Sequence, residues 1–232
     1  MKNKRIPPAE ARRLFLGSIG TGLGILGATA IGPAAASAQS GDSRFQPARH
    51  EQDDWYDKLP GKHRFVFDTT SPDGFSWGVT FATNFMEANR TGYGLTDADL
   101  AVVIVARHKS TPFGYNDAIW AKYSVPLAAQ TNNFVDPATN AAPIINVYGT
   151  PGVNGGRPGR LDALLKRGVH LAVCQMATRA IAGSLARATN GNADDIFKEL
   201  GANLVANAQL VPAGIVAINR AQEHGYTFVT AS

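Results

Sequence analysis

The fold is decided by the run Leu100-Ala101-Val102-Val103-Ile104-Val105, which contains no polar residue. A strand of this kind is apolar on both of its faces, and such strands are typical of parallel sheets that are covered on both sides. We therefore expect residues 100–105 to form a central strand of a parallel sheet.

Strands and helices alternate on either side of this run. Short apolar or alternating segments predict further strands at residues 63–68, 169–173, 206–211 and 226–230. Amphipathic segments predict helices at residues 77–89, 116–123, 160–167, 175–188, 194–203 and 213–224. Strands separated by helices form parallel crossover units. The sequence thus predicts an α/β fold: a three-layer α/β/α sandwich with a mostly parallel sheet of about five strands.

Two segments interrupt this alternation. Residues 39–62 are mostly polar and charged, with an aromatic pair at Trp55 and Tyr56, and they predict an extended N-terminal arm. Residues 126–159 are rich in proline and glycine, and they predict an irregular insert in which only residues 143–148 could form an extended piece. The α/β domain is therefore expected at residues 63–232, with the insert at 126–159.

Residues 1–38 predict a twin-arginine export signal. Arg12 and Arg13 precede an apolar, glycine-rich run at residues 14–31, and Ala36-Ser37-Ala38 offers a small-residue cleavage site. Such signals export folded proteins, so we expect a periplasmic or secreted location. A retained membrane anchor is the alternative, since about eighteen residues can just span a bilayer, but the glycines and the cleavage site favour a cleaved leader.

The positive net charge of the chain comes from this leader. Residues 1–38 hold five of the 22 lysines and arginines and one of the 18 acidic residues, so residues 39–232 are neutral on balance. A nucleic-acid partner would need a clustered positive face. We therefore expect no nucleic-acid partner. After leader cleavage we also expect no membrane span, because no later segment is apolar enough.

Cys174 is the single cysteine, so the chain cannot form an internal disulfide. It follows the predicted strand at 169–173 and opens the next helix, where backbone N–H groups stabilise a thiolate. Thr178, four residues on, overhangs the sulfur, whereas His170 lies about 13 Å away along the strand. Residue context leaves both a reactive thiol and a buried, inert one open.

A second polar segment follows the strand at residues 100–105. It includes His108, Asn116 and Asp117, which could hold an anion or donate a proton; the alternative is a solvated loop in which Asn116 caps the next helix. The histidines show no metal-ligand spacing, and no Gly-x-Gly-x-x-Gly follows a strand. We therefore expect no metal and no bound cofactor, although an exported hydrolase or redox enzyme with a cofactor stays an alternative.

Several motifs between residues 64 and 229 occur together. They are Val105-Ala106-Arg107-His108, Thr111-Pro112-Phe113, Asn116-Asp117-Ala118, Leu171-Ala172-Val173-Cys174, Leu210-Val211-Pro212-Ala213-Gly214-Ile215-Val216 and Ala221-Gln222-Glu223-His224-Gly225-Tyr226-Thr227-Phe228-Val229. In these motifs the chain resembles the DsrE/DsrF-like family of sulfur-metabolism proteins, and most closely the exported branch of that family. It departs from the cytoplasmic sulfur-relay members in its leader and in the insert at 126–159.

The resemblance implies a small three-layer α/β fold that assembles into homo-oligomers. It also implies that Cys174 carries a persulfide and exchanges sulfane sulfur with a donor or acceptor protein, as a sulfurtransferase or sulfur carrier. His108, Asn116 and Asp117 are then expected to line the same rim as Cys174. The alternative function is a non-catalytic oligomeric module that binds a small ligand or a partner, with Cys174 buried and structural.

Overall fold

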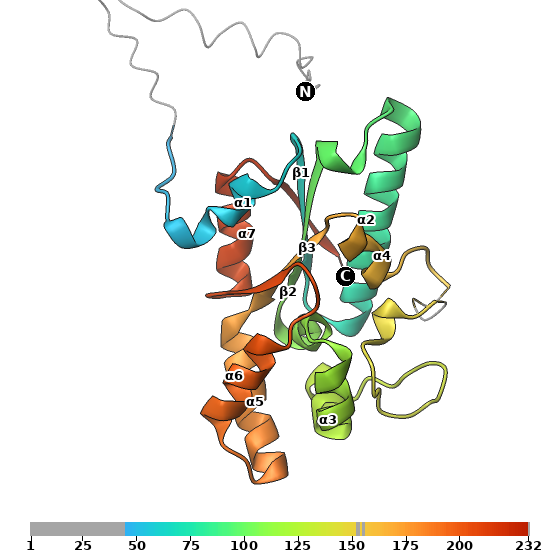
Figure 1. Cartoon of the computed structure of the whole chain (residues 1–232), viewed down its shortest axis with the longest axis vertical. Helices are drawn as coiled ribbons and strands as arrows, with labels where there is room; N and C mark the ends of the chain where they lie inside the picture. The colour runs from blue at the N-terminus through green and yellow to red at the C-terminus, as the bar shows by residue number, and fades with distance from the viewer. Residues whose placement is uncertain (1–44, 152–153, 155, 232) are drawn as a thin grey trace, which may run out of the picture. The chain divides into compact units, whose positions relative to one another are not determined.

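The computed structural model describes residues 45–151, 154 and 156–231. The predicted leader at residues 1–38 and the first residues of the predicted arm lie outside this range. The described residues from Gln46 onward belong to one compact unit (Figure 1). Within the described residues, no helix combines the length and the apolar character that a membrane span requires.

The unit is built on a five-stranded sheet in which all neighbouring strands are parallel. The strand order is β4-β3-β2-β1-β5. The strands are β1 (His63–Thr69), β2 (Leu100–Ala106), β3 (His170–Cys174), β4 (Ala208–Val211) and β5 (Thr227–Ala231). The predicted α/β sandwich is confirmed, and the run at residues 100–105 is the central strand.

Strand β2 explains why the sheet is covered on both faces. All of its residues are buried, and their side chains alternate between two separate apolar clusters. Val102 and Ile104 belong to one cluster, whereas Val103 and Val105 belong to the other. Because successive side chains of a strand point to opposite faces, each face of β2 needs its own cover.

Helices supply both covers. The helices are α1 (Trp55–Lys58), α2 (Pro72–Tyr93), α3 (Asp117–Ala128), α4 (Leu161–Lys166), α5 (Gln175–Thr189), α6 (Ala193–Ala202) and α7 (Gly214–Glu223). Helix α7 and the short α1 lie on one side of the sheet, and α2 with α4 on the other (Figure 1). Helices α5 and α6 pack on each other, and α3 packs on α5.

Helix α2 is longer at both ends than the prediction of residues 77–89. It begins at Pro72, after Ser71 caps it by accepting a hydrogen bond from the N–H of Gly74 at 2.9 Å. It ends at Gly94, which is left-handed with a φ of 68°. A proline at the first helical position and a glycine just past the end are regular helix boundary signals, whereas the prediction followed only the amphipathic pattern of residues 77–89.

The prediction of an extended N-terminal arm is wrong for the described part of that segment. It folds into a short 3₁₀ helix, Glu51–Asp53, and helix α1. Tyr56 is fully buried, its hydroxyl donates to the carbonyl of Ala217 at 2.9 Å, and its own carbonyl accepts from the hydroxyl of Tyr226 at 2.9 Å. The arm therefore belongs to the packed layer beside α7.

The insert also differs in part from its prediction. Helix α3 continues through Pro126 to Ala128, and the expected extended piece at residues 143–148 is replaced by a 3₁₀ turn at Val147–Gly149. Asn154 is buried and donates to the hydroxyl of Thr80 at 2.9 Å. Polar contacts such as this one to α2, and not strand pairing to the sheet, help to anchor the insert.

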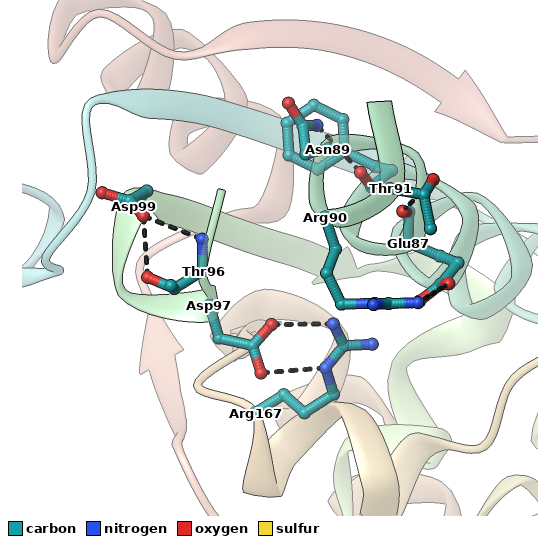
Figure 2. A network of polar contacts seen from close by, with 9 residues as sticks. Glu87, Asn89, Arg90, Thr91, Thr96, Asp97, Asp99 and Arg167 are labelled. Carbon is teal, nitrogen blue, oxygen red and sulfur yellow. Dashed lines mark hydrogen bonds and ion pairs between the residues drawn. The ribbon is translucent and has the colours of Figure 1, made fainter. Parts of the chain in front are cut away.

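A polar network ties the loop before β2 to the end of α4 (Figure 2). Thr96 and Asp99 form a capping box. Arg167 donates from Nε and Nη2 to the two oxygens of Asp97, at 3.0 and 2.7 Å. These contacts lie at the amino end of β2. The polar residues singled out in the sequence lie at the opposite edge of the sheet, where the strands have their carboxyl ends.

Candidate functional site

The carboxyl ends of β1, β2 and β3 bring three polar residues to one edge of the sheet. Asp68 is next to last in β1, Arg107 follows β2 and Cys174 ends β3. In open parallel sheets, this edge is where ligands bind. It is therefore the first place to test for chemistry.

Cys174 lies where the sequence predicts, at the junction of a central strand and a helix. It is the last residue of β3 and the N-cap residue of α5. Its sulfur accepts a hydrogen bond from the N–H of Ala177 at 3.4 Å. Only 7% of the residue is exposed, so the thiol contacts a helix N-terminus but presents little surface.

Arg107 and Asp68 form an ion pair beside this cysteine. The guanidinium donates from Nε and Nη2 to the two carboxylate oxygens at 2.7 and 2.8 Å, and Asp68 is 2% exposed. The pKa of Arg107 is raised, mainly by these hydrogen bonds to Asp68, and further by the negative charge of a Cys174 thiolate. A fixed cation thus lies within electrostatic range of the sulfur.

The stem of Arg107 is held from the other side by α7. A Cβ built on Gly214 would overlap the Cβ of Arg107 and lie 2.9 Å from its Cδ. Gly214 is the first residue of α7, so only a residue without a side chain lets this helix start against Arg107. The turn after β4 therefore helps to position the cation.

Thr178 is fully buried and has a structural role. Its hydroxyl donates to the carbonyl of Cys174 at 2.9 Å and accepts from the hydroxyl of Tyr115 at 2.9 Å. Burial raises the pKa of Tyr115, so this phenol stays a donor. Thr178 therefore lies one helical turn after Cys174, as predicted. It is buried below the surface of this edge, and its hydroxyl already makes two hydrogen bonds within the protein.

His108 and Asn116 differ in their surroundings. His108 is exposed and begins the 3₁₀ helix His108–Gly114 with a positive φ of 55°. Asn116 caps α3, its Oδ1 accepting from the N–H groups of Ala118 at 3.1 Å and Ile119 at 3.4 Å. The capping alternative for Asn116 is therefore confirmed.

Asn116 and Asp117 also line a cavity of about 470 Å³ between α3, α4 and the loop at residues 145–150. Cys174, His108 and Thr178 do not line it. The structure therefore separates the predicted rim into two places: the edge with Asp68, Arg107 and Cys174, and the cavity with Asn116 and Asp117.

The sequence analysis did not identify three residues that shape the edge at Cys174 or the cavity at Asp117. Asp68 is a buried acid that follows the apolar residues 65–67 of β1, a signal that could have been noticed. Tyr115 supports Thr178, and Asn146 lies in the insert, where nothing local predicts its neighbours. In the part of the chain that the structure describes, no three of the His, Cys, Asp and Glu side chains gather in a group that could hold a metal ion.

Comparisons with known proteins leave the family of this chain unassigned. No protein-family model matches the sequence, and no curated protein matches it. Among solved structures, the chain is similar to a protein of unknown function from Methanobacterium thermoautotrophicum, with 15% identity and a TM-score of 0.37. That alignment covers 73% of this chain and 99% of the other.

Proposed function

We propose that this protein binds and transfers sulfane sulfur through a persulfide on Cys174. The observation that carries the proposal is the hydrogen bond from the N–H of Ala177 to the Cys174 sulfur, at the start of α5. A helix N-terminus stabilises negative charge, and the Arg107 guanidinium lies at the same edge of the sheet. The resemblance to the DsrE/DsrF-like family, in which a cysteine in this position can carry sulfur, supports the assignment.

The transfer needs no oxidant or cofactor. The Cys174 thiolate attacks the outer sulfur of a donor persulfide, an S–S bond forms to Cys174, and the donor's S–S bond breaks. The electron pair of the broken bond leaves with the donor thiolate. Transfer to an acceptor thiolate is the same step in reverse, so electrons and atoms balance at each stage.

The proposal also covers the location, the assembly and the partners of the protein. The protein is exported by the twin-arginine route to the periplasm or beyond, forms homo-oligomers, and exchanges sulfur with a donor or acceptor protein. Because Cys174 is 7% exposed, a donor or acceptor sulfur must reach the small part of this residue that is accessible.

Mass spectrometry of the intact protein tests this function. Purified protein incubated with thiosulfate or polysulfide should gain the mass of whole sulfur atoms, and dithiothreitol should remove them. A Cys174→Ser variant should gain nothing. If wild-type protein acquires no sulfur from either donor, the carrier function is wrong and the alternative remains: a non-catalytic ligand- or partner-binding module with a structural cysteine.

A relocated thiol provides the matched control. Ala180 is an exposed position within α5, away from the helix start, so Cys174→Ser combined with Ala180→Cys presents one accessible thiol without the same environment. This variant should react readily with iodoacetamide but gain sulfur from thiosulfate more slowly than the wild type does. Equal sulfur uptake would show that the surroundings of Cys174 contribute nothing.

A further inference from the structure

The cavity beside α3 is a separate site from the edge at Cys174. Its volume of about 470 Å³ falls within the range of about 300–1,000 Å³ that small-molecule sites occupy. The aliphatic part of its wall comes from the insert, from α4 and from the segment before β4: Ile145, Leu161, Leu165 and Val205. A ligand with a compact aliphatic body would fit this wall.

The charged groups of the cavity are carboxylates. Asp117 and Asp162 line it, and none of the described lining residues is a lysine, arginine or histidine. Asp162 is neutralised by an ion pair with Arg160. Asp117 is exposed, and one of its oxygens accepts from the backbone N–H of Asn146 at 2.8 Å. A carboxylate accepts about four hydrogen bonds, so Asp117 can accept further donors.

Asn146 is the second observation that points to a ligand. It lines the cavity and is 5% exposed, and its amide oxygen has no hydrogen-bond partner among the described residues. Its Nδ2 donates to the carbonyls of Phe113 at 2.8 Å and Tyr115 at 2.9 Å. The amide cannot be flipped, because its oxygen would then face two carbonyl oxygens. A buried acceptor without a donor is costly. A ligand donor that reaches this oxygen after a small displacement of the cavity wall would remove that cost.

We propose that this cavity binds a small primary ammonium ion on an aliphatic body, with the ammonium group at Asp117 and Asn146. An ammonium group carries three donors and no acceptor, which matches a site that offers acceptors and a negative charge. An anion would meet Asp117 without a compensating cation. The proposal does not depend on sulfur chemistry at Cys174, because that residue does not line the cavity.

Three probes of one shape test the charge requirement. The probes are 3-methylbutylamine, the uncharged 3-methylbutanol and the anionic 4-methylpentanoate, each titrated against the purified full chain and followed by NMR chemical shifts. The amine should bind about tenfold more tightly than the alcohol, as expected for one charge-assisted interaction, and the carboxylate should not bind. Binding of the alcohol or the carboxylate as tight as that of the amine, or no binding of the amine, would overturn the proposal.

Substitutions then locate the site. Asp117→Asn should weaken amine binding about tenfold, whereas Asp194→Asn, a matched change in the exposed first turn of α6, should leave it unchanged. Ala118 also lines the cavity and is exposed, so Ala118→Leu should block binding by filling space without altering charge. Amine affinity that survives Ala118→Leu would place the bound amine elsewhere and refute the assignment.

Discussion

Arg107 and Asp68 join the two central strands of the sheet at the edge where Cys174 lies. Both carboxylate oxygens are engaged, at 2.7 and 2.8 Å, and the acid is almost completely buried. The pair holds the guanidinium in one orientation at this edge. This single contact links the stability of the domain to the electrostatics of its candidate reactive residue.

Removing one partner of this pair should destabilise the domain strongly. Arg107→Met leaves the Asp68 carboxylate buried without a counter-charge, so we expect a loss of about 3 kcal/mol in the free energy of unfolding. The double variant Asp68→Asn with Arg107→Met should recover much of that loss, because no buried charge remains. Urea denaturation of both variants measures the difference. Equal losses in the two would mean that the charge of Asp68 is not the cause.

Gly214→Ala should disturb Arg107 without touching the ion pair directly. The added Cβ would overlap the Cβ of Arg107, and overpacking of this kind costs about 1–3 kcal/mol. The rate of Cys174 alkylation by iodoacetamide should change as well, because the neighbouring cation moves. Thermal unfolding and alkylation kinetics provide the two measurements.

Gly183→Ala is the control for that substitution. Gly183 lies within α5, and the nearest atom to an added Cβ is Arg187 Nη1 at 3.7 Å. Alanine in an uncrowded helix interior should stabilise the chain by about 0.5–1 kcal/mol. If both glycine variants behaved alike, the proposed contact between Gly214 and Arg107 would not explain the effect.

Tyr56→Phe should loosen the N-terminal arm. The substitution removes the hydroxyl that donates to Ala217 and leaves a buried carbonyl with one donor fewer, so we expect a cost of about 1 kcal/mol. Tyr93→Phe, at a residue that is 79% exposed, should cost nothing measurable. Hydrogen exchange of residues 50–62 should accelerate in the first variant only.

Acid should release the same arm. The pKa of Asp57 lies below its usual value of 3.8, chiefly because of its hydrogen bond with His224 and then because of Arg64. A lowered pKa in the folded state means that the contact contributes stability above pH 3.8 and loses it as the pH falls through the lowered value. Pepsin cleavage near Tyr56, normalised to an unfolded substrate, should therefore accelerate below pH 3.8.

Asp57→Asn separates this effect from general acid unfolding. The variant has no carboxylate to titrate at this position, so its arm should already be cleaved faster at pH 4 and should respond less to further acidification. The same pH response in both proteins would assign the release to other groups.

The sheet could be predicted because each strand can be recognised from its own residues. An apolar run such as residues 100–105 needs cover on both faces wherever it lies, and helices between strands require parallel crossovers. Helix ends were harder to place. Pro72 and Gly94 are boundary signals for α2, but the prediction followed the amphipathic pattern of residues 77–89 and made the helix too short. Gly78 lies within α2 and serves close packing, since a Cβ there would lie 2.7 Å from Thr69 Cγ2.

The arm and the cavity could not be predicted, because their contacts join distant segments. Tyr56 bonds to Ala217, 161 residues away along the chain, and Asn146 meets Asp117 only because the insert returns to the start of α3. The predicted strand at residues 169–173 and the helix after it did place Cys174 at the junction of a strand and a helix. They could not show that Asn116 and Asp117 turn toward a different space.

Because β1 lies between β2 and β5, the sheet can be completed only after the last strand has been synthesised. Residues Phe65–Thr69 pair with Thr227–Ala231, so a nascent chain that has reached only the fourth strand still has one flank of its first strand open to water and to other unfinished chains. Parallel pairings of such long sequence separation form slowly. The flank of β1 is therefore closed last, after the whole chain has been synthesised.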